Sequence, residues 1–119
     1  MKYNKRLSAT IVLTTYNGSL YIRELLESLA NQSRKIDEVL IYDDSSSDNT
    51  VEIVEKFIDE INLKAHWHFV VNQKNKGWKK NFRDAILKVG TDVVFPCDQD
   101  DFWFEKKVEK MMEYMEIND

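Results

Sequence analysis

Ala9-Thr10-Ile11-Val12-Leu13, followed by Thr14-Thr15-Tyr16 and closed by Asn17-Gly18, is the stretch that decides the fold of this 119-residue chain. Its apolar run is short and rich in β-branched residues, and Asn-Gly marks a turn, so it predicts a buried strand that ends near Thr15. An apolar stripe at helical spacing comes next, at Ile22, Leu25, Leu26 and Leu29. The stretch therefore opens a strand-and-helix unit.

The same unit recurs along the chain. The expected strands are Val39-Leu40-Ile41-Tyr42, residues 66–71 and Val93-Val94-Phe95. The expected helices carry apolar stripes at Val51, Val54, Ile58 and Ile61, at Phe82, Ala85, Ile86 and Val89, and at Val108, Met111, Met112 and Met115. The alternative for the Met pair is a partner-binding surface, but its spacing is that of a buried stripe and favours core. We expect Asp48 or Asn49 to cap the second helix and Pro96 to end the fourth strand. The third strand is expected near an edge.

This alternation predicts an α/β fold. Helices of this length cross back over a sheet by right-handed connections, which makes the strands parallel. We expect one open, doubly wound, mostly parallel sheet with helices on both faces. Three Gly and one Pro give no sign of a linker or repeat, so residues 1–119 are interpreted as a single domain.

Composition narrows the partners and the compartment. The formal net charge of −4 argues against nucleic acid, which calls for a basic face, so any phosphate must be bound locally. Cys97 is the only cysteine and suits a reducing, cytoplasmic compartment. The basic start and the short, polar-interrupted run after it fit neither a signal peptide nor a transmembrane segment.

Polar residues follow every expected strand, and ligands of open α/β sheets bind outside the carboxyl ends of the strands. These segments are Thr14-Thr15-Tyr16-Asn17, Asp43-Asp44-Ser45-Ser46-Ser47, Asn72-Gln73-Lys74-Asn75-Lys76-Gly77 and Asp98-Gln99-Asp100-Asp101. We therefore expect one polar rim that contains a ligand site.

The segment Asp98 to Asp101 holds three carboxylates within four residues, which repel one another unless a cation is present. Mg²⁺ or Mn²⁺ bound together with substrate phosphates would relieve that repulsion. The alternative is that Asp100 and Asp101 cap the last helix while Asp98 closes a turn. A second acidic pair, Asp43-Asp44, ends another strand and favours a ligand site, with Asp44 bound to a base or ribose.

Other candidates carry weaker signals. Lys76 and Gly77 precede the third helix, where positive charge and backbone N–H groups suit a diphosphate, although lysine runs are usually solvated faces. Neither a dinucleotide fingerprint nor a P-loop is present in the sequence. His66 and His68 are interpreted as surface residues rather than metal ligands, and Cys97 as a small core residue rather than a nucleophile.

Five landmarks in order resemble the nucleotide-binding segment of family 2 glycosyltransferases, which have the GT-A fold. They are Ile11-Val12-Leu13-Thr14-Thr15-Tyr16-Asn17, Tyr42-Asp43-Asp44-Ser45-Ser46, Asn75-Lys76-Gly77, Asn81-Phe82 and Cys97-Asp98-Gln99-Asp100-Asp101-Phe102-Trp103. The last landmark and the Gly-x-x-x-Asn-Phe pattern resemble a bacterial branch that includes rhamnosyltransferases for surface polysaccharides.

The resemblance implies roles for particular residues. Thr14 and Tyr16 would flank the nucleobase, Asp44 would hydrogen-bond it, Asp98 would face the ribose and share the metal, and Asp100 would be the principal metal ligand. The rest of the expected nucleotide-sugar set is Thr15, Asn17, Asp43, Lys76, Gly77 and Asn81. Trp103 would border the sugar pocket or anchor the following helix. Many relatives have Arg-Asn in the third helix where this chain has Phe82-Arg83, so the cation that meets the diphosphate is left open.

The implied reaction transfers a sugar from a nucleoside diphosphate, with inversion, to a hydroxyl of a glycan or lipid-linked acceptor in surface polysaccharide synthesis. Such enzymes take the catalytic base from sequence after the Asp-x-Asp segment, so no residue here is assigned as catalytic. We expect a truncated chain that is inactive alone, from an enzyme that is cytoplasmic or peripheral at the inner face of the membrane. Its oligomeric state is left open.

Two other classes of protein are alternatives. A receiver-type signalling module also binds Mg²⁺, but its acidic pair follows the first strand, where this chain has Thr15-Tyr16-Asn17. A nucleotidyltransferase should have a Gly-rich, basic loop at the same place, and this chain does not.

Overall fold

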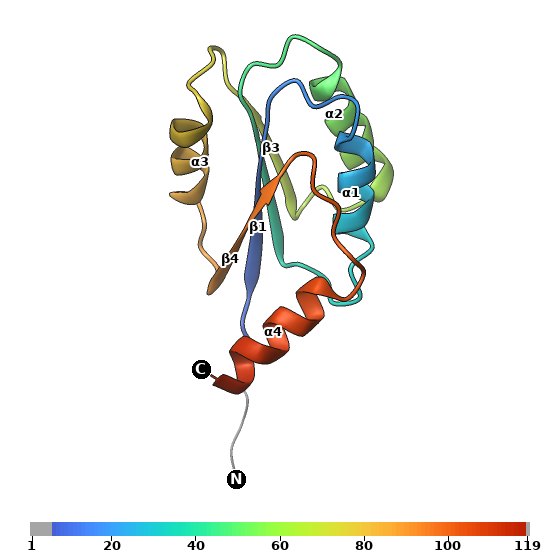
Figure 1. Ribbon diagram of the computed structural model, residues 1–119, viewed down its shortest axis with the longest axis vertical. Coiled ribbons are helices and arrows are strands. Elements are labelled where there is room, and N and C mark those ends of the chain that lie inside the picture. Colours follow the sequence, from blue (N-terminus) through green and yellow to red (C-terminus); the bar gives the residue numbers. More distant parts are fainter. Residues whose placement is uncertain (1–5, 119) are drawn as a thin grey trace.

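The computed structural model describes residues 6–118, in which strands and helices alternate as expected. The elements are β1 (Ala9–Thr15), α1 (Ile22–Ala30), β2 (Glu38–Asp43), α2 (Thr50–Ile61), β3 (Trp67–Val71), α3 (Trp78–Ile86), β4 (Val93–Asp98) and α4 (Lys107–Asn118). The strands form one parallel sheet in the order β3-β2-β1-β4. All the carboxyl ends of the strands therefore lie at one edge, at the top of Figure 1.

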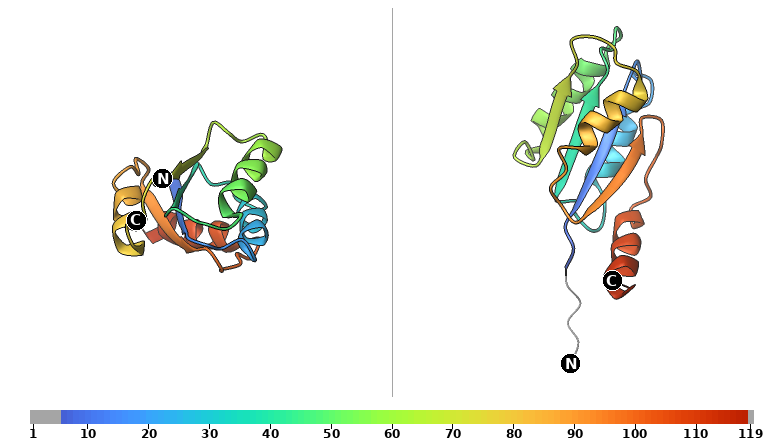
Figure 2. Two further views of the ribbon diagram at one scale, coloured as in Figure 1. Left: turned by 90° about the horizontal axis from the view of Figure 1, so that it is seen from above. Right: turned by 90° about the vertical axis from the view of Figure 1, so that its left-hand side faces the viewer.

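Helices cover both faces of this sheet, with α1 and α2 on one face and α3 on the other (Figures 1 and 2). Because successive side chains of a strand point to opposite faces, β1 supplies both layers. Ile11 and Leu13 belong to the larger core beneath α1 and α2, whereas Val12 packs in a smaller cluster with Ala85 of α3. The expected doubly wound α/β fold is confirmed.

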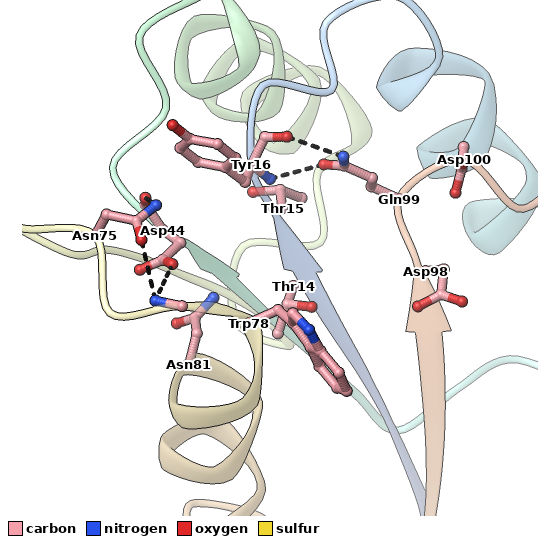
Figure 3. A pocket seen from close by; sticks show the side chains of 11 residues that line it. Thr14, Thr15, Tyr16, Asp44, Asn75, Trp78, Asn81, Asp98, Gln99 and Asp100 are labelled. Atoms are coloured by element: carbon pink, nitrogen blue, oxygen red, sulfur yellow. Dashed lines mark hydrogen bonds between the residues drawn. The ribbon is translucent and has the colours of Figure 1, made fainter.

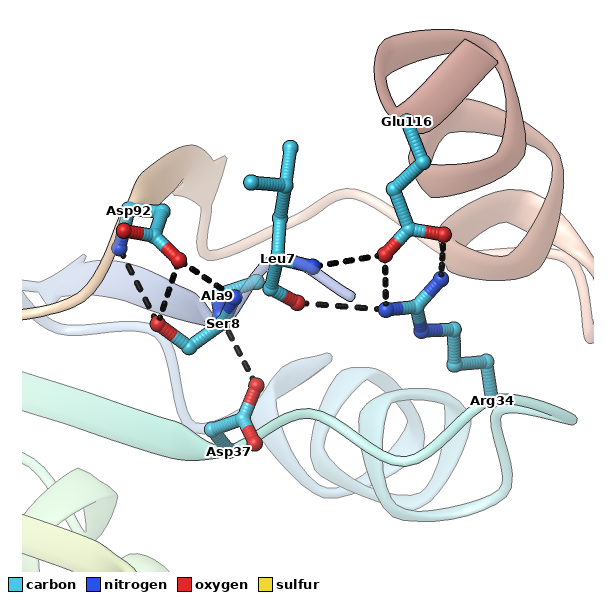
Figure 4. A network of polar contacts seen from close by, with 7 residues as sticks. All are labelled: Leu7, Ser8, Ala9, Arg34, Asp37, Asp92 and Glu116. Carbon is cyan, nitrogen blue, oxygen red and sulfur yellow. Dashed lines mark hydrogen bonds and ion pairs between the residues drawn. The ribbon is translucent and has the colours of Figure 1, made fainter. Parts of the chain in front are cut away.

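The last helix departs from this plan, because α4 lies beside the amino ends of the strands (Figure 1). Val108 and Met112 are buried there, but Met111 is 40% exposed, so only part of the expected stripe is core. A bidentate ion pair holds the helix: Arg34 Nη1 and Nη2 donate to Glu116 at 2.9 and 2.7 Å. Figure 4 shows this pair beside the first residues of the described chain.

Three local expectations need correction. Pro96 lies within β4 instead of ending it; β4 is an edge strand, where a residue without an N–H is tolerated on the unpaired side. The helix α3 ends at Ile86, so Val89 packs from the turn that follows. Asn49 is the N-cap residue of α2 but makes no side-chain capping bond.

Asp48, the other expected cap, accepts hydrogen bonds from the N–H of Thr50, the first residue of α2, and also from the Thr50 hydroxyl and the N–H of Ser19, so it pairs an otherwise free N–H of the helix. Partial burial of this carboxylate raises its pKa, but the Thr50 and Ser19 hydrogen bonds outweigh that effect and lower the pKa to about 2. Asp48 therefore joins α2 to the β1–α1 loop.

The strand β3 is at the edge of the sheet, as predicted. His66 and His68 are 59% and 47% exposed and lie 3.7 and 3.1 Å from Oε2 of Glu38, a neighbour that sequence spacing did not indicate. Their exposure is that of surface residues, as expected. No helix between residues 6 and 118 is long and apolar enough to cross a membrane.

Candidate functional site

A pocket of about 400 Å³ lies at the carboxyl edge of the sheet. Its lining comes from the ends of the strands and the first turn of α3: Thr14, Thr15, Tyr16, Asp44, Asn75, Gly77, Trp78, Asn81, Asp98, Gln99 and Asp100 (Figure 3). The site is therefore built by parts of the chain that are up to 86 residues apart, between Thr14 and Asp100. The sequence predicts a single polar rim at this edge.

Asp44 organises one wall of the pocket. Its buried carboxylate accepts hydrogen bonds from Asn72 Nδ2 at 3.0 Å, Lys76 N at 2.8 Å and Gly77 N at 2.9 Å. A carboxylate has about four acceptor positions, so one remains for a ligand donor. Asp44 thus shapes the β3–α3 loop and can still contact a bound molecule.

Asn81 lines the pocket from α3, but its amide has structural partners. Nδ2 donates to the carbonyl of Tyr42 at 2.9 Å, and Oδ1 accepts from Asn72 at 2.8 Å. These bonds fasten the start of α3 to the end of β2, so this face of the pocket is rigidly placed.

Two other expected residues lie behind the lining. Asp43 is fully buried and accepts from the hydroxyls of Thr15 and Ser46, both at 2.6 Å. Asn17, at φ 48°, accepts from the N–H of Ser47 at 2.8 Å and joins the loops that follow β1 and β2. Both residues support the loops that carry the pocket and do not line it.

Lys76, the cation expected at a diphosphate, also stands outside the lining. Its ammonium group is 2.7 Å from Asp84 Oδ2 on α3, and this pairing lowers the pKa of Asp84. The backbone of Lys76, not its charge, serves the pocket through the hydrogen bond to Asp44.

Asp98 and Asp100 form the acidic wall opposite Asp44 (Figure 3). Both are exposed, and neither carboxylate accepts a hydrogen bond or forms an ion pair within residues 6–118. Asp101 differs, because its Oδ2 accepts from the Asp98 N–H at 3.4 Å across the turn and it is not part of the lining. Asp98 closes this turn through its backbone, because its carbonyl accepts from the Asp101 N–H at 3.1 Å, but the side chains of Asp98 and Asp100 take no part in the closure. The capping part of the alternative is wrong, since α4 begins only at Lys107.

This donor set fits one way of holding a divalent cation. The described chain has no cage of three ligating side chains. Mg²⁺, however, is commonly held by one or two carboxylates together with substrate phosphates and water. Two unpaired carboxylates in a pocket match that pattern.

Sequence reasoning missed three lining residues as separate site members. Gln99 is the middle residue of the Asp-x-Asp pattern. Asn75 begins the Asn75-Lys76-Gly77 segment, and its Nδ2 donates to the carbonyl of Asp44 at 3.1 Å. Trp78 follows Gly77 and continues the helical spacing of Phe82 and Ala85, a pattern that indicated core. Trp78 faces the pocket because it lies at the start of α3, next to the edge where the strands of the sheet end.

Trp103 and Cys97 are core residues. Trp103 is 2% exposed and packs edge-on against Phe95 with ring centroids 6.1 Å apart, so it anchors the chain before α4 and does not border the pocket. Burial raises the pKa of the Cys97 thiol to about 12, with a further contribution from Asp101. Such a thiol is a poor nucleophile, as expected from sequence.

A parallel α/β domain with a polar pocket at its strand ends has the arrangement in which open α/β sheets bind ligands. The profile of Glycosyl transferase family 2 matches residues 10–119, and the chain belongs to that family. The receiver and nucleotidyltransferase alternatives are thereby set aside.

Two curated relatives illustrate the family. Poly(ribitol-phosphate) beta-N-acetylglucosaminyltransferase TarS of Staphylococcus aureus is 36% identical over 95 residues, which is 78% of this chain and 16% of TarS. The dTDP-rhamnosyl transferase RfbG of Shigella flexneri is 31% identical over 114 residues, 89% of this chain and 37% of RfbG. The chain thus spans well under half the length of either relative.

Solved structures agree with the fold. The crystal structure of S. aureus TarS 1-349 in complex with UDP superposes with a TM-score of 0.81 at 28% identity, over 93% of this chain and 32% of that one. The architecture is therefore GT-A.

Proposed function

We propose that this domain binds a nucleoside diphosphate sugar with a divalent cation and serves sugar transfer to an acceptor hydroxyl in bacterial surface polysaccharide synthesis. The observation that carries the proposal is the pocket in which the Asp44-organised loop faces the unpaired carboxylates of Asp98 and Asp100. Support comes from TarS, which has been solved with UDP and with UDP-GlcNAc, and from RfbG, a dTDP-rhamnosyl transferase.

The roles follow from the two walls. Asp44, with its remaining acceptor position, is assigned to an N–H donor of the nucleobase, and Thr14 and Tyr16 to the flanks of the base. Asp98 and Asp100 are assigned to the cation, Mg²⁺ or Mn²⁺, with Asp98 also toward the ribose. Bound there, a divalent cation would neutralise charge on the diphosphate leaving group.

The acceptor side is not assigned to any lining residue. Asp44 is held by its loop, and Asp98 and Asp100 are assigned to the cation, so none of these carboxylates is proposed as the base that takes the acceptor proton. A glycan or lipid-linked acceptor and a cytoplasmic location are part of the proposal; the location rests on Cys97, whose buried thiol suits a reducing compartment.

Calorimetric titration of UDP, dTDP and GDP, each with Mg²⁺, Mn²⁺ or EDTA, tests the proposal. We expect at least one nucleotide to bind with the cation and more weakly in EDTA. Asp100→Asn should remove the cation-dependent part of the affinity without changing stability, because its carboxylate makes no internal hydrogen bond.

Asp101→Asn is the matched control, since Asp101 is adjacent in sequence but outside the pocket. It should retain cation-dependent binding. Absence of binding for every nucleotide and cation combination would contradict the proposal, as would equal loss of binding in both variants.

A further inference from the structure

The chain contains three tryptophans, and one differs sharply from the others. Trp67 and Trp103 are 6% and 2% exposed, whereas Trp78 is 70% exposed and lines the pocket. A large aromatic side chain left in water forgoes its burial free energy, so its position at a pocket calls for an explanation.

The helical position of Trp78 places it on the side of α3 that faces the sheet. It precedes Phe82 by four residues and Ala85 by seven, which places all three on the face of α3 that packs on the sheet. Ala85 is buried there, but Trp78 lies about two turns nearer the carboxyl edge, where the strands end. The indole lies in the pocket next to Thr14, between α3 and β4 (Figure 3).

The conformation of Gly77, the residue before Trp78, is held by a hydrogen bond of the protein itself. Gly77 has φ 87°, a conformation that favours glycine, and its N–H donates to Asp44 Oδ2 at 2.9 Å. The carboxylate assigned to the nucleobase therefore also positions the residue next to Trp78. The hydrogen bond between Gly77 and Asp44 therefore fixes the position of the Trp78 backbone relative to Asp44.

The chemistry of the ring selects what can lie against it. The face of an indole carries partial negative charge, which disfavours a diphosphate and favours a planar, uncharged group. Lys79 Nζ lies over one face of the Trp78 ring, 5.8 Å from its centroid, and the side chain as a whole is 70% exposed, which leaves ring surface for a ligand. Of the parts of a nucleoside diphosphate sugar, the base is the planar one.

We propose that Trp78 is the stacking platform for the nucleobase of the donor, on the side of the pocket formed by α3. This inference rests on the proposed function and deepens it, because it names the residue that supplies base affinity that does not depend on the cation. Stacking of a base on an aromatic side chain tolerates different bases. Trp78 is therefore a determinant of affinity more than of base identity.

Iodide quenching of tryptophan fluorescence tests the proposal directly, because iodide reaches exposed indoles and Trp78 is the exposed tryptophan. The probes are UDP and GDP, each with Mg²⁺. We expect a saturating nucleotide to protect the iodide-accessible fluorescence, and Trp78→Phe to lose that accessible component. Trp78→Ala should weaken nucleotide binding by about 5-fold to 150-fold, whereas Trp78→Phe retains most of it.

Phe104→Ala is the matched control, since Phe104 is an aromatic residue 77% exposed outside the pocket. It should leave both affinity and quenching unchanged. Nucleotide that binds by calorimetry while iodide accessibility and the Trp78→Ala affinity stay as in the unaltered protein overturns the stacking role alone. Protection by UDP-GlcNAc but not by UDP would assign Trp78 to the sugar and also overturn it. Absence of all nucleotide binding would instead contradict the proposed function.

Discussion

The side-chain amide of Gln99 makes two hydrogen bonds with the backbone of Tyr16: its Oε1 accepts from Tyr16 N at 2.7 Å, and its Nε2 donates to Tyr16 O at 2.9 Å. The pair joins the loop after β4 to the loop after β1, although the residues are 83 apart in sequence. Both residues line the pocket. The middle residue of the Asp-x-Asp pattern is therefore a structural clamp that fixes the acidic wall relative to Tyr16.

This clamp needs a glycine beside it. A Cβ on Gly18 would lie 2.5 Å from Gln99 Oε1, so Gly18→Ala should displace the Gln99 side chain and break both hydrogen bonds. We expect a loss of about 1–2 kcal/mol in the free energy of unfolding, measured in urea, and weaker nucleotide binding. In a Gln99→Ala background the same substitution should be nearly neutral, because the clashing atoms are gone.

Gly90→Ala serves as the control, because a Cβ at Gly90 meets nothing within 4 Å. Its effect should stay within about 0.5 kcal/mol. Equal losses for Gly18→Ala with and without Gln99 would show that the clamp is not what Gly18 protects.

Asp44 is the second residue whose role is open to direct test. Asp44→Asn replaces one carboxylate oxygen by an NH₂ group that cannot accept; since Lys76 N donates to Oδ1 and Gly77 N to Oδ2, one of these two N–H groups loses its acceptor. Leaving a buried donor unpaired costs about 1–3 kcal/mol, so the free energy of unfolding should fall by that amount. Asp59→Asn removes only an exposed ion pair with Lys64 and should change stability by less than about 1 kcal/mol. Comparable losses in the two variants would contradict the organising role of Asp44.

The fold was predictable from sequence because its signals are local. Each strand is an apolar run of the right length, and the crossover helices carry stripes at helical spacing. The place of α4 was not predictable, because it depends on distant partners: Arg34 holds Glu116, and Gln32 accepts the N–H of Val108 at 3.0 Å. The spacing of apolar residues along the sequence cannot predict such long-range pairs.

The candidate site was predictable as a rim but only partly as a set of residues. Strand ends in a parallel sheet must meet, which places Thr14, Asp44 and Asp98 together. Which side chains line the pocket depends on hydrogen bonds between loops, and these turn Asp43 inward toward Thr15. Trp78 was missed because its spacing from Phe82 and Ala85 is that of a core stripe, whereas the residue itself lies past the end of the sheet and lines the pocket.

The thiol of Cys97 offers a test of the core beneath the acidic wall. With the pKa near 12, only about one part in ten thousand is thiolate at pH 8, and the side chain is buried. Labelling by a disulfide reagent such as DTNB should therefore be very slow in the folded protein and rapid once urea unfolds it. Rapid labelling at pH 8 without urea would show that this part of the core opens readily.

The ion pair that fastens α4 predicts how stability depends on pH. Hydrogen bonds from Arg34, together with one from Leu7 N at 2.7 Å, lower the pKa of Glu116 from 4.5 to about 2. The folded state therefore releases the proton more readily than the unfolded state, and the pair stabilises the fold above about pH 4.5. That contribution is lost as the pH falls from about 4.5 to about 2.

Glu116→Gln removes the charge at every pH, so the comparison isolates this one carboxylate from the others that titrate in acid. The difference in Tm between the unaltered protein and Glu116→Gln, measured by circular dichroism, should be largest at pH 7 and close progressively below about pH 4.5. Glu113→Gln, on the same helix, is the control: Glu113 is exposed and makes no hydrogen bond or close ion pair within residues 6–118, so its difference should be small throughout. A Glu116→Gln difference that does not change with pH would mean that the side chain acts on α4 through packing and not through its charge.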